Sequence, residues 1–167
     1  HSIMHALLSS TPQPDFVLNL HSGASLTAKA LRMSIDEQVP VGGMGDLSSA
    51  LSLFLVREYV DPETQFRERG LRQHRRIAGF YRLDGHKYRI ERYNLSPLTV
   101  IFIYDYELAA EAIRQAYLEY GTFDIVVASN PNAQITSNAT DVANQLGLEV
   151  HKWGSFLSRL NYEHRKK

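Results

Sequence analysis

The C-terminal part of the chain alternates short apolar runs with longer amphipathic segments. The apolar runs, which are typical of buried strands, are found at 98–106, 123–129 and 148–153. A segment with the apolar spacing of a helix follows each run, at 107–121, 135–147 and 154–160. This alternation of strands and helices predicts right-handed crossovers and a parallel segment of β-sheet.

The first part of the chain predicts further elements for the same sheet. A strand is expected at 15–20, and helices are expected at 25–37 and 46–60. The helix at 46–60 would bury one apolar face, formed by Leu47, Ala50, Leu51, Phe54 and Leu55. Asp84-Gly85 stands between two β-rich runs and predicts a hairpin.

Together these patterns predict an α/β fold with a mixed sheet and a C-terminal β-α-β-α-β-α parallel segment. We expect a single domain over 15–161, a loose lead-in at 1–14 and a polar tail at 162–167. The length of 167 residues is enough for one ordinary domain with its own core.

Composition narrows the class of protein. Hydrophobic residues make up 44% and charged residues 22%, as in ordinary soluble proteins. The absence of cysteine excludes disulfides, thiolate catalysis and cysteine metal sites. No apolar run approaches the roughly 18 residues that would span a bilayer. We therefore expect a cytoplasmic protein without a membrane partner.

Charge is concentrated in one segment although the formal net charge is zero. Residues 67–92 hold nine basic and three acidic residues, hence a local net charge of +6. Eight of the nine are arginines, which suit bidentate contact with phosphate, and interleaved tyrosines could stack on bases. The predicted nucleic-acid-binding residues are Arg67, Arg69, Arg72, Arg75, Arg76, Arg82, Lys87 and Arg89. Pairing of these side chains with acids elsewhere, such as Glu58, Glu63, Glu111 and Glu119, is the alternative.

Two loops at the carboxyl ends of predicted strands carry candidate ligand groups, as expected in open α/β sheets. Asn130 and Asn132 flank a proline, and Thr136 or Ser137 would cap the next helix, whose N-terminus suits an anion. Turn chemistry alone also explains these residues. Asp105 and Glu107 stand two apart and would share one side of a continued strand, where they could hold a divalent metal. The alternative is a strand end followed by an acid that favours a helix N-terminus.

The stretch 123–160 resembles the closing part of the restriction-endonuclease-like fold, especially that of Mrr-type nucleases. The similar features are a strand, a helix with two alanines, a strand that begins Gly-Leu-Glu-Val, and a short Phe/Leu-rich helix. The residues that carry them are Ala139, Ala143, Gly147, Leu148, Glu149, Val150, Phe156, Leu157 and Leu160. With 98–121 included, the resemblance covers the residues from 98 to 160. It implies DNA as the partner and a role in a restriction or defence system.

The family's catalytic pattern is not matched. The resemblance implies an acidic residue and a Glu/Gln-x-Lys triplet on the strand before the long helix, with Mg²⁺ held by the acids. Here that strand offers Asp105 and Glu107 without a lysine, and the hairpin offers Asp84, Lys87 and Glu91 in a different order. The catalytic candidates are Asp105, Glu107, Asp84 and Glu91, with Asp105 and Glu107 as metal ligands. We favour a lost or divergent site over an intact nuclease.

Three hypotheses follow from the sequence. The first is a DNA-associated domain with a nuclease-like fold and a degenerate or divergent site, with Mg²⁺ as cofactor only if catalysis survives. The second is a non-catalytic protein-interaction or regulatory domain that forms a homodimer or a larger assembly. The third is a Rossmann-like domain that binds a phosphorylated ligand at 129–137.

Overall fold

The structure, a computed structural model, describes residues 3–20 and 26–164. The chain divides into two compact units, an N-terminal unit of residues 1–66 and a C-terminal unit of residues 67–167. The boundary between them falls inside helix α4 (Pro62–Gln73). The prediction of a single domain over 15–161 is not tested by this division and stays a prediction. None of the described helices is long and apolar enough to cross a membrane.

The N-terminal unit has a small apolar core. Its elements are α1 (Ile3–Leu8), β1 (Val17–Leu18), α2 (Ala28–Asp36), β2 (Val41–Gly42) and α3 (Met44–Ser52). β1 and β2 pair in parallel, and Met4, Leu8 and Val39 form the buried centre. The segment expected as a loose lead-in therefore contains a helix, because Met4 and Leu8 lie one turn apart and both reach the core.

Helix α2 begins later than the sequence pattern predicts. Thr27 is the N-cap, and its hydroxyl accepts a hydrogen bond from the Ala30 N–H at 3.2 Å. Residue 25, where this helix was expected to begin, lies outside the described residues.

Helix α3 is much shorter than the predicted helix 46–60. It ends at Ser52, and Phe54 takes a left-handed backbone conformation with φ 55°. Of the five residues on the predicted apolar face only Ala50 is buried, whereas Phe54 is 93% exposed. The prediction of a buried face over 46–60 is therefore wrong.

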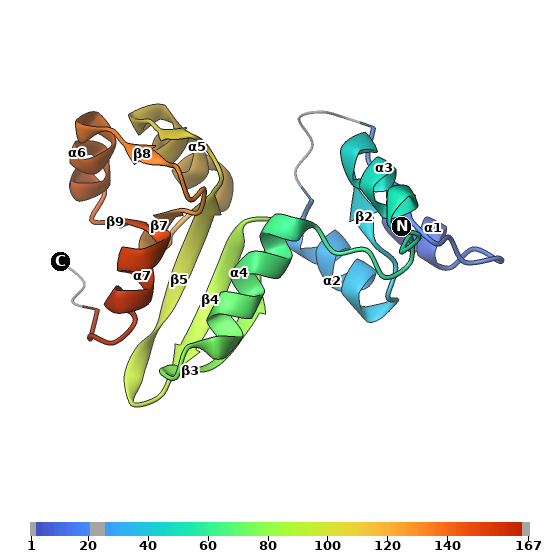
Figure 1. The fold of residues 1–167 in the computed structure, drawn as a ribbon, viewed down its shortest axis with the longest axis horizontal. Coiled ribbons are helices and arrows are strands. Elements are labelled where there is room, and N and C mark those ends of the chain that lie inside the picture. Colours follow the sequence, from blue (N-terminus) through green and yellow to red (C-terminus); the bar gives the residue numbers. More distant parts are fainter. Residues whose placement is uncertain (1–2, 21–25, 165–167) are drawn as a thin grey trace. The chain divides into compact units, whose positions relative to one another are not determined.

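The C-terminal unit is a mixed five-stranded sheet with helices on both faces (Figure 1). The strand order is β3-β4-β5-β7-β9. The strands are β3 (Ile77–Arg82), β4 (Lys87–Arg92), β5 (Leu95–Ile103), β7 (Ile125–Ala128) and β9 (Glu149–Lys152). β4 is antiparallel to β3 and β5, and β5, β7 and β9 are parallel to one another. The predicted α/β class, hairpin and parallel segment are confirmed.

Two apolar clusters fix the helices of this unit against the sheet. The helices are α4, α5 (Ala110–Tyr120), α6 (Ser137–Gln145) and α7 (Trp153–Arg159). Ile101 and Val126 face α5 and α6, whereas Val100 and Phe102 face α4 and α7. Successive residues of β5 are thus buried on opposite faces, which explains the uninterrupted apolar run in the sequence.

Two very short strands were not predicted. β6 (Glu107–Leu108) and β8 (Gln134–Ile135) pair in parallel outside the main sheet. They connect the segment after β5 to the segment after β7, so residue 107 lies in β6 and not in the first turn of α5.

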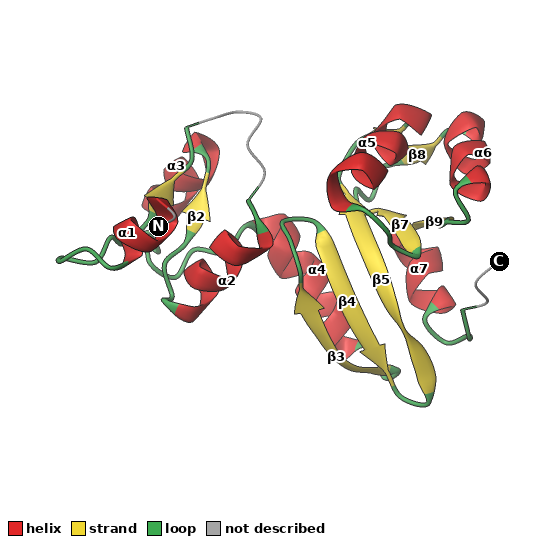
Figure 2. Cartoon of the chain, turned by 180° about the vertical axis from the view of Figure 1, so that it is seen from behind, coloured by secondary structure: helices red, strands yellow, loops and turns green. Residues whose placement is uncertain are grey.

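The sheet is covered unevenly at its β3 end. Figure 2 shows β3 and β4 with α4 behind them and no helix in front of them. Within the described part of the C-terminal unit, the front of this antiparallel part of the sheet is therefore an open surface.

Candidate nucleic-acid interface

Exposed arginines gather on the second half of α4 and on the loop that leads from it to β3. We call Arg69, Arg72, Arg75 and Arg76 the arginine strip, and all four residues are exposed. The guanidinium groups of Arg69, Arg75 and Arg76 have no hydrogen-bond or ion-pair partner among the described residues of the C-terminal unit. Arg72 pairs with Glu68 at 2.7 Å one turn earlier on the helix. The strip thus carries an excess of positive charge that the unit itself does not neutralise.

Arg67 belongs to the core and not to the strip. Its residue is only 1% exposed, so the guanidinium does not reach the surface where we had predicted a nucleic-acid contact. The Cζ atom lies 5.8 Å from the ring centre of Tyr88 and 5.5 Å from that of Phe102. Both distances suit cation–π attraction between the guanidinium and the two rings.

The other predicted basic residues have partners within the fold. Arg82 donates to the Gly85 carbonyl at 3.0 Å, and Lys87 donates to the Tyr120 carbonyl at 2.6 Å. Arg89 pairs with Glu91 at 2.7 Å. The alternative of structural pairing thus describes much of the hairpin. Two of the acids involved are Glu68 and Glu91.

The candidate catalytic acids are not brought together as a metal site. β5 ends at Ile103, so the continued strand that would have aligned Asp105 with Glu107 does not exist. Asp105 is exposed in a loop, and Glu107 is exposed in β6. Among the described residues no group of three or more histidine, aspartate or glutamate side chains could hold a metal ion.

The two hairpin acids serve local structure. Asp84 accepts a hydrogen bond from the Gly85 N–H at 2.7 Å, which stabilises the turn between β3 and β4. Glu91 is occupied by Arg89. β5, the strand that precedes the long helix α5, reads LSPLTVIFI and contains neither an acid nor a lysine. The departure from the Glu/Gln-x-Lys pattern is therefore present in the folded strand as well.

Two side chains of the predicted ligand loop accept local hydrogen bonds. The Asn130 side-chain oxygen accepts from the Asn132 N–H at 2.9 Å. Thr136 is the N-cap of α6, and its hydroxyl accepts from the Ala139 N–H at 3.1 Å. Both contacts are those expected from turn and cap chemistry. Ligand binding at this loop stays a prediction.

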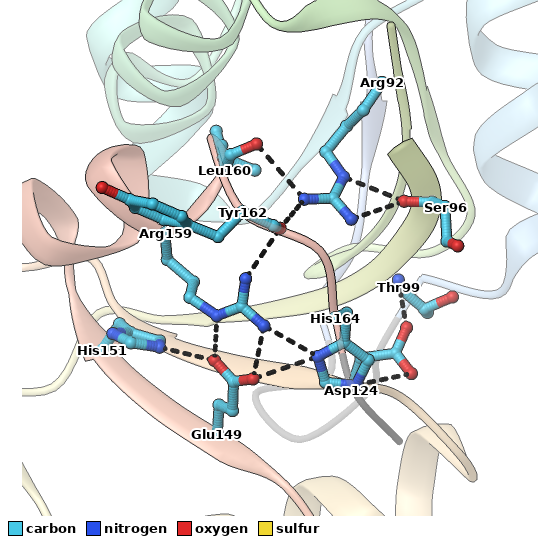
Figure 3. A network of polar contacts seen from close by, with 10 residues as sticks. All are labelled: Arg92, Ser96, Thr99, Asp124, Glu149, His151, Arg159, Leu160, Tyr162 and His164. Atoms are coloured by element: carbon cyan, nitrogen blue, oxygen red, sulfur yellow. Dashed lines mark hydrogen bonds and ion pairs between the residues drawn. The ribbon is translucent and has the colours of Figure 1, made fainter. Parts of the chain in front are cut away.

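A dense polar network around Glu149 was not predicted from the sequence (Figure 3). Arg159 of α7 donates to both carboxylate oxygens of Glu149, at 2.6 and 2.8 Å. His151 and His164 each approach the same carboxylate to 3.0 Å. The Arg159 hydrogen bonds lower the pKa of Glu149 to about 2, so this carboxylate stays ionised.

This network also binds the segment after α7. Arg92 donates to the Tyr162 carbonyl at 2.7 Å and to the Ser96 carbonyl at 2.6 Å (Figure 3). His164 lies 3.7 Å from Asp124 and its side chain is only 6% exposed. Residues 162–164, expected to belong to a polar tail, are thus fixed to the sheet, and 165–167 lie outside the described residues. The residues that hold 162–164 in place are far apart in the sequence, so no local sequence pattern could have predicted these contacts.

A pocket of about 260 Å³ opens beside the network, and α6 and β9 contribute to its lining. Its lining includes Asn144, His151 and His164. Because both histidines contact Glu149, the pocket's imidazoles are engaged inside the protein.

Comparison with known proteins returns no relative. No protein-family model matches the chain, and no curated protein or solved structure matches it significantly. The resemblance to the restriction-endonuclease-like fold stays a prediction.

Proposed function

We propose that this protein is a non-catalytic nucleic-acid-binding domain whose arginine strip contacts the phosphate backbone. In this proposal the fold of the C-terminal unit is related to that of restriction endonucleases, and the metal site of that family has been lost. The partner would be DNA, in a restriction or defence context.

The observation that carries the proposal is the exposure of Arg69, Arg75 and Arg76 without a partner in their own unit. Like charges held close together repel one another, and an anionic ligand relieves that repulsion. Arginine presents five donors in a rigid fork that matches phosphate oxygens. The C-terminal unit as a whole has fifteen basic and eleven acidic residues, a formal charge of +4. A polyanion is therefore the ligand that best fits this surface.

The non-catalytic part of the proposal is supported by the positions of the four candidate acids. Asp84 and Glu91 are engaged by Gly85 and Arg89, while Asp105 and Glu107 lie beyond the end of β5. Phosphodiester hydrolysis assisted by Mg²⁺ needs carboxylates that converge on one ion. We therefore expect binding without cleavage.

The test is equilibrium binding of a labelled DNA oligonucleotide, measured by fluorescence anisotropy across a salt series. The triple variant Arg69→Ala/Arg75→Ala/Arg76→Ala should bind about tenfold more weakly or worse at low salt, and its logarithmic salt slope should fall by about three. Addition of Mg²⁺ should leave the DNA intact. Absence of wild-type binding at low salt would overturn the proposal.

A charge-matched control separates the strip from general electrostatics. The variant Arg32→Ala/Arg57→Ala/Arg114→Ala removes the same charge from three other exposed positions. It should bind DNA with an affinity close to that of the wild type. Equal losses in the two triple variants would show that net charge, and not the strip, governs binding.

A second candidate function has an observation of its own in the N-terminal unit. Leu51, Leu53, Phe54 and Leu55 are all exposed, and Phe54 combines 93% exposure with a left-handed backbone. Exposed apolar side chains that gather in one short segment are typical of a protein-interaction surface. This supports the protein-interaction hypothesis for residues 1–66, beside nucleic-acid binding by the C-terminal unit.

A further inference from the structure

The open face of the sheet, on the side away from α4, has the features of a stacking surface. Tyr81 of β3 lies opposite Arg89 of β4, and Arg89 lies opposite Thr99 of β5. Cross-strand partners share a face, so these three side chains are on the side opposite to Tyr88 and Ile90, which are buried. No helix of the C-terminal unit covers that side at the β3 end (Figure 2).

Two further observations show that this face is open. Tyr81 is 61% exposed although it lies within a strand. Gly79, opposite Glu91 in the same hairpin, could carry a Cβ atom that would meet no other atom within 4 Å. A side chain at position 79 could therefore project from this face without meeting other protein atoms.

A second exposed tyrosine connects this hairpin to the arginine strip. Tyr93 directly follows β4 and is 56% exposed. Its N–H donates to the Arg76 carbonyl at 2.9 Å, which fixes the tyrosine beside the loop that carries Arg75 and Arg76. Arg89, which lies opposite Tyr81, is four residues from Tyr93. At a strand rise of about 3.3 Å per residue, these four residues correspond to about 13 Å. The hairpin therefore carries an exposed aromatic ring near each end, and one of them adjoins unpaired arginines.

We propose that the ligand of this surface is single-stranded nucleic acid, with bases stacked on Tyr81 and Tyr93 and phosphates on Arg75 and Arg76. This inference rests on the proposed function, because it specifies which nucleic acid the arginine strip binds. Arg89 is not counted among the phosphate contacts, since Glu91 already balances its charge.

The physical reason for the preference is the access to the base faces. In a duplex the faces of the bases are covered by their neighbours, so an exposed tyrosine on a flat sheet finds only the backbone. In a single strand the bases can turn outward and stack on aromatic side chains regardless of sequence. Arginines alone would bind both forms, whereas the tyrosines stabilise only the single-stranded complex.

The experiment compares one labelled strand with the duplex of the same sequence, by anisotropy at constant salt. The wild type should bind the single strand more tightly than the duplex. Tyr81→Ala/Tyr93→Ala should lose about tenfold or more in affinity for the single strand and leave duplex affinity unchanged. Tyr81→Phe/Tyr93→Phe should retain wild-type affinity, because the stacking ring is kept.

The control variant is Tyr104→Ala/Tyr106→Ala. It removes two exposed tyrosines that follow the C-terminal end of β5, away from Tyr93 in the sequence. It should bind the single strand like the wild type. Duplex binding as tight as single-strand binding would overturn this inference. So would an unchanged single-strand affinity of the Tyr81/Tyr93 alanine variant, provided that the arginine triple variant still loses binding. In either case the proposed function stands. Absence of binding to both ligands at low salt would overturn the inference and the proposed function together.

Discussion

At the scale of single residues, neighbouring arginines on one helix have opposite roles. Arg67 is buried against two aromatic rings, whereas Arg69, two positions later, is exposed. Residues two apart on a helix point in different directions, so they need not share a surface. Composition counts both as positive charge, but only the exposed arginine is available to a ligand.

Gly70 follows Arg69 at the point where α4 approaches α7 closely. Only glycine fits there without displacing a neighbouring side chain. A Cβ at this position would lie 2.5 Å from Cζ2 of Trp153, an atom of a rigid ring. Alanine favours a helix over glycine by roughly 1 kcal/mol. We nevertheless expect Gly70→Ala to lower the free energy of unfolding, by about 2 kcal/mol, because the ring must be displaced.

The matched control for this substitution is Gly154→Ala, in α7. An added Cβ there meets no atom within 4 Å, so this variant should be at least as stable as the wild type. Urea denaturation of both variants gives the two free energies. A Gly70→Ala protein as stable as the wild type would contradict the close approach.

Glu149 gives the protein an acid-sensitive contact. Its pKa is lowered from 4.5 to about 2 in the folded state, first by the Arg159 hydrogen bonds. A lowered folded-state pKa stabilises the fold above the unfolded-state pKa, and that stabilisation is lost as the carboxylate is protonated. Stability should therefore fall as the pH drops from about 4.5 toward about 2.

The measurement is the free energy of unfolding as a function of pH for the wild type and for Glu149→Gln. The variant should be less stable at neutral pH and should show a smaller loss between pH 4.5 and pH 2, the range set by the two pKa values. Glu107→Gln, at an exposed position of β6, should keep the wild-type slope. Parallel curves for Glu149→Gln and the wild type would refute the role of this carboxylate.

At the scale of elements, α3 shows how helical periodicity can mislead. The spacing of Leu47, Ala50, Leu51 and Phe54 is that of an amphipathic helix, yet α3 ends at Ser52. The Leu55 N–H donates to the Ala50 carbonyl, and the Phe54 N–H donates to the Leu51 carbonyl. These bonds close the helix with Phe54 in the left-handed conformation that glycine usually occupies.

This helix end predicts an unusual gain of stability from removal of an aromatic ring. Because Phe54 is 93% exposed, Phe54→Gly gives up little packing and relieves the unfavourable φ of 55°. The variant should melt at a higher temperature, with a gain of about 1 kcal/mol. Phe54→Ala keeps the left-handed strain and should show no such gain. If glycine destabilises the protein, Phe54 is making contacts that its exposure does not reveal.

At the scale of the whole molecule, the two units differ in charge. The N-terminal unit has three basic and seven acidic residues, a formal charge of −4, against +4 for the C-terminal unit. The global value of zero therefore hides an acidic unit with exposed apolar residues and a basic unit with the arginine strip. Net charge of the full chain was a poor guide to its ligands, because binding depends on the local field.

The division into units predicts that the C-terminal unit folds without the N-terminal one. A fragment of residues 61–167 retains Asp61, whose carboxylate accepts from the Thr64 N–H at 2.8 Å in the first turn of α4. It should unfold cooperatively and bind DNA with the same dependence on the arginine strip. Calorimetry and anisotropy measure the two properties. A fragment that fails to fold would instead favour the single domain over 15–161.

The sequence alone was informative wherever a structure depends on local patterns. Apolar runs covered on both faces, a hairpin at Asp84-Gly85 and the cap Thr136 all follow from neighbouring residues, and the mixed sheet with its parallel segment follows from their order. The excess of positive charge at 67–92 was also visible directly. These features could be predicted because hydrophobic periodicity and turn chemistry depend on residues that are close in the sequence.

Only the tertiary structure showed which polar side chains are exposed and unpaired, and therefore available to a ligand. It buried Arg67 between aromatic rings, gave Lys87 and Arg89 partners, and kept Asp105 from sharing a strand with Glu107. It also assembled the Glu149 network from residues far apart in the chain. Burial and pairing depend on contacts between distant segments. For that reason the sequence predicted the main strands of the C-terminal unit and the excess of charge, but not the end of α3 or the strands β6 and β8. The packing of α4 and α7 on one face of the sheet decided which of the predicted side chains are buried there.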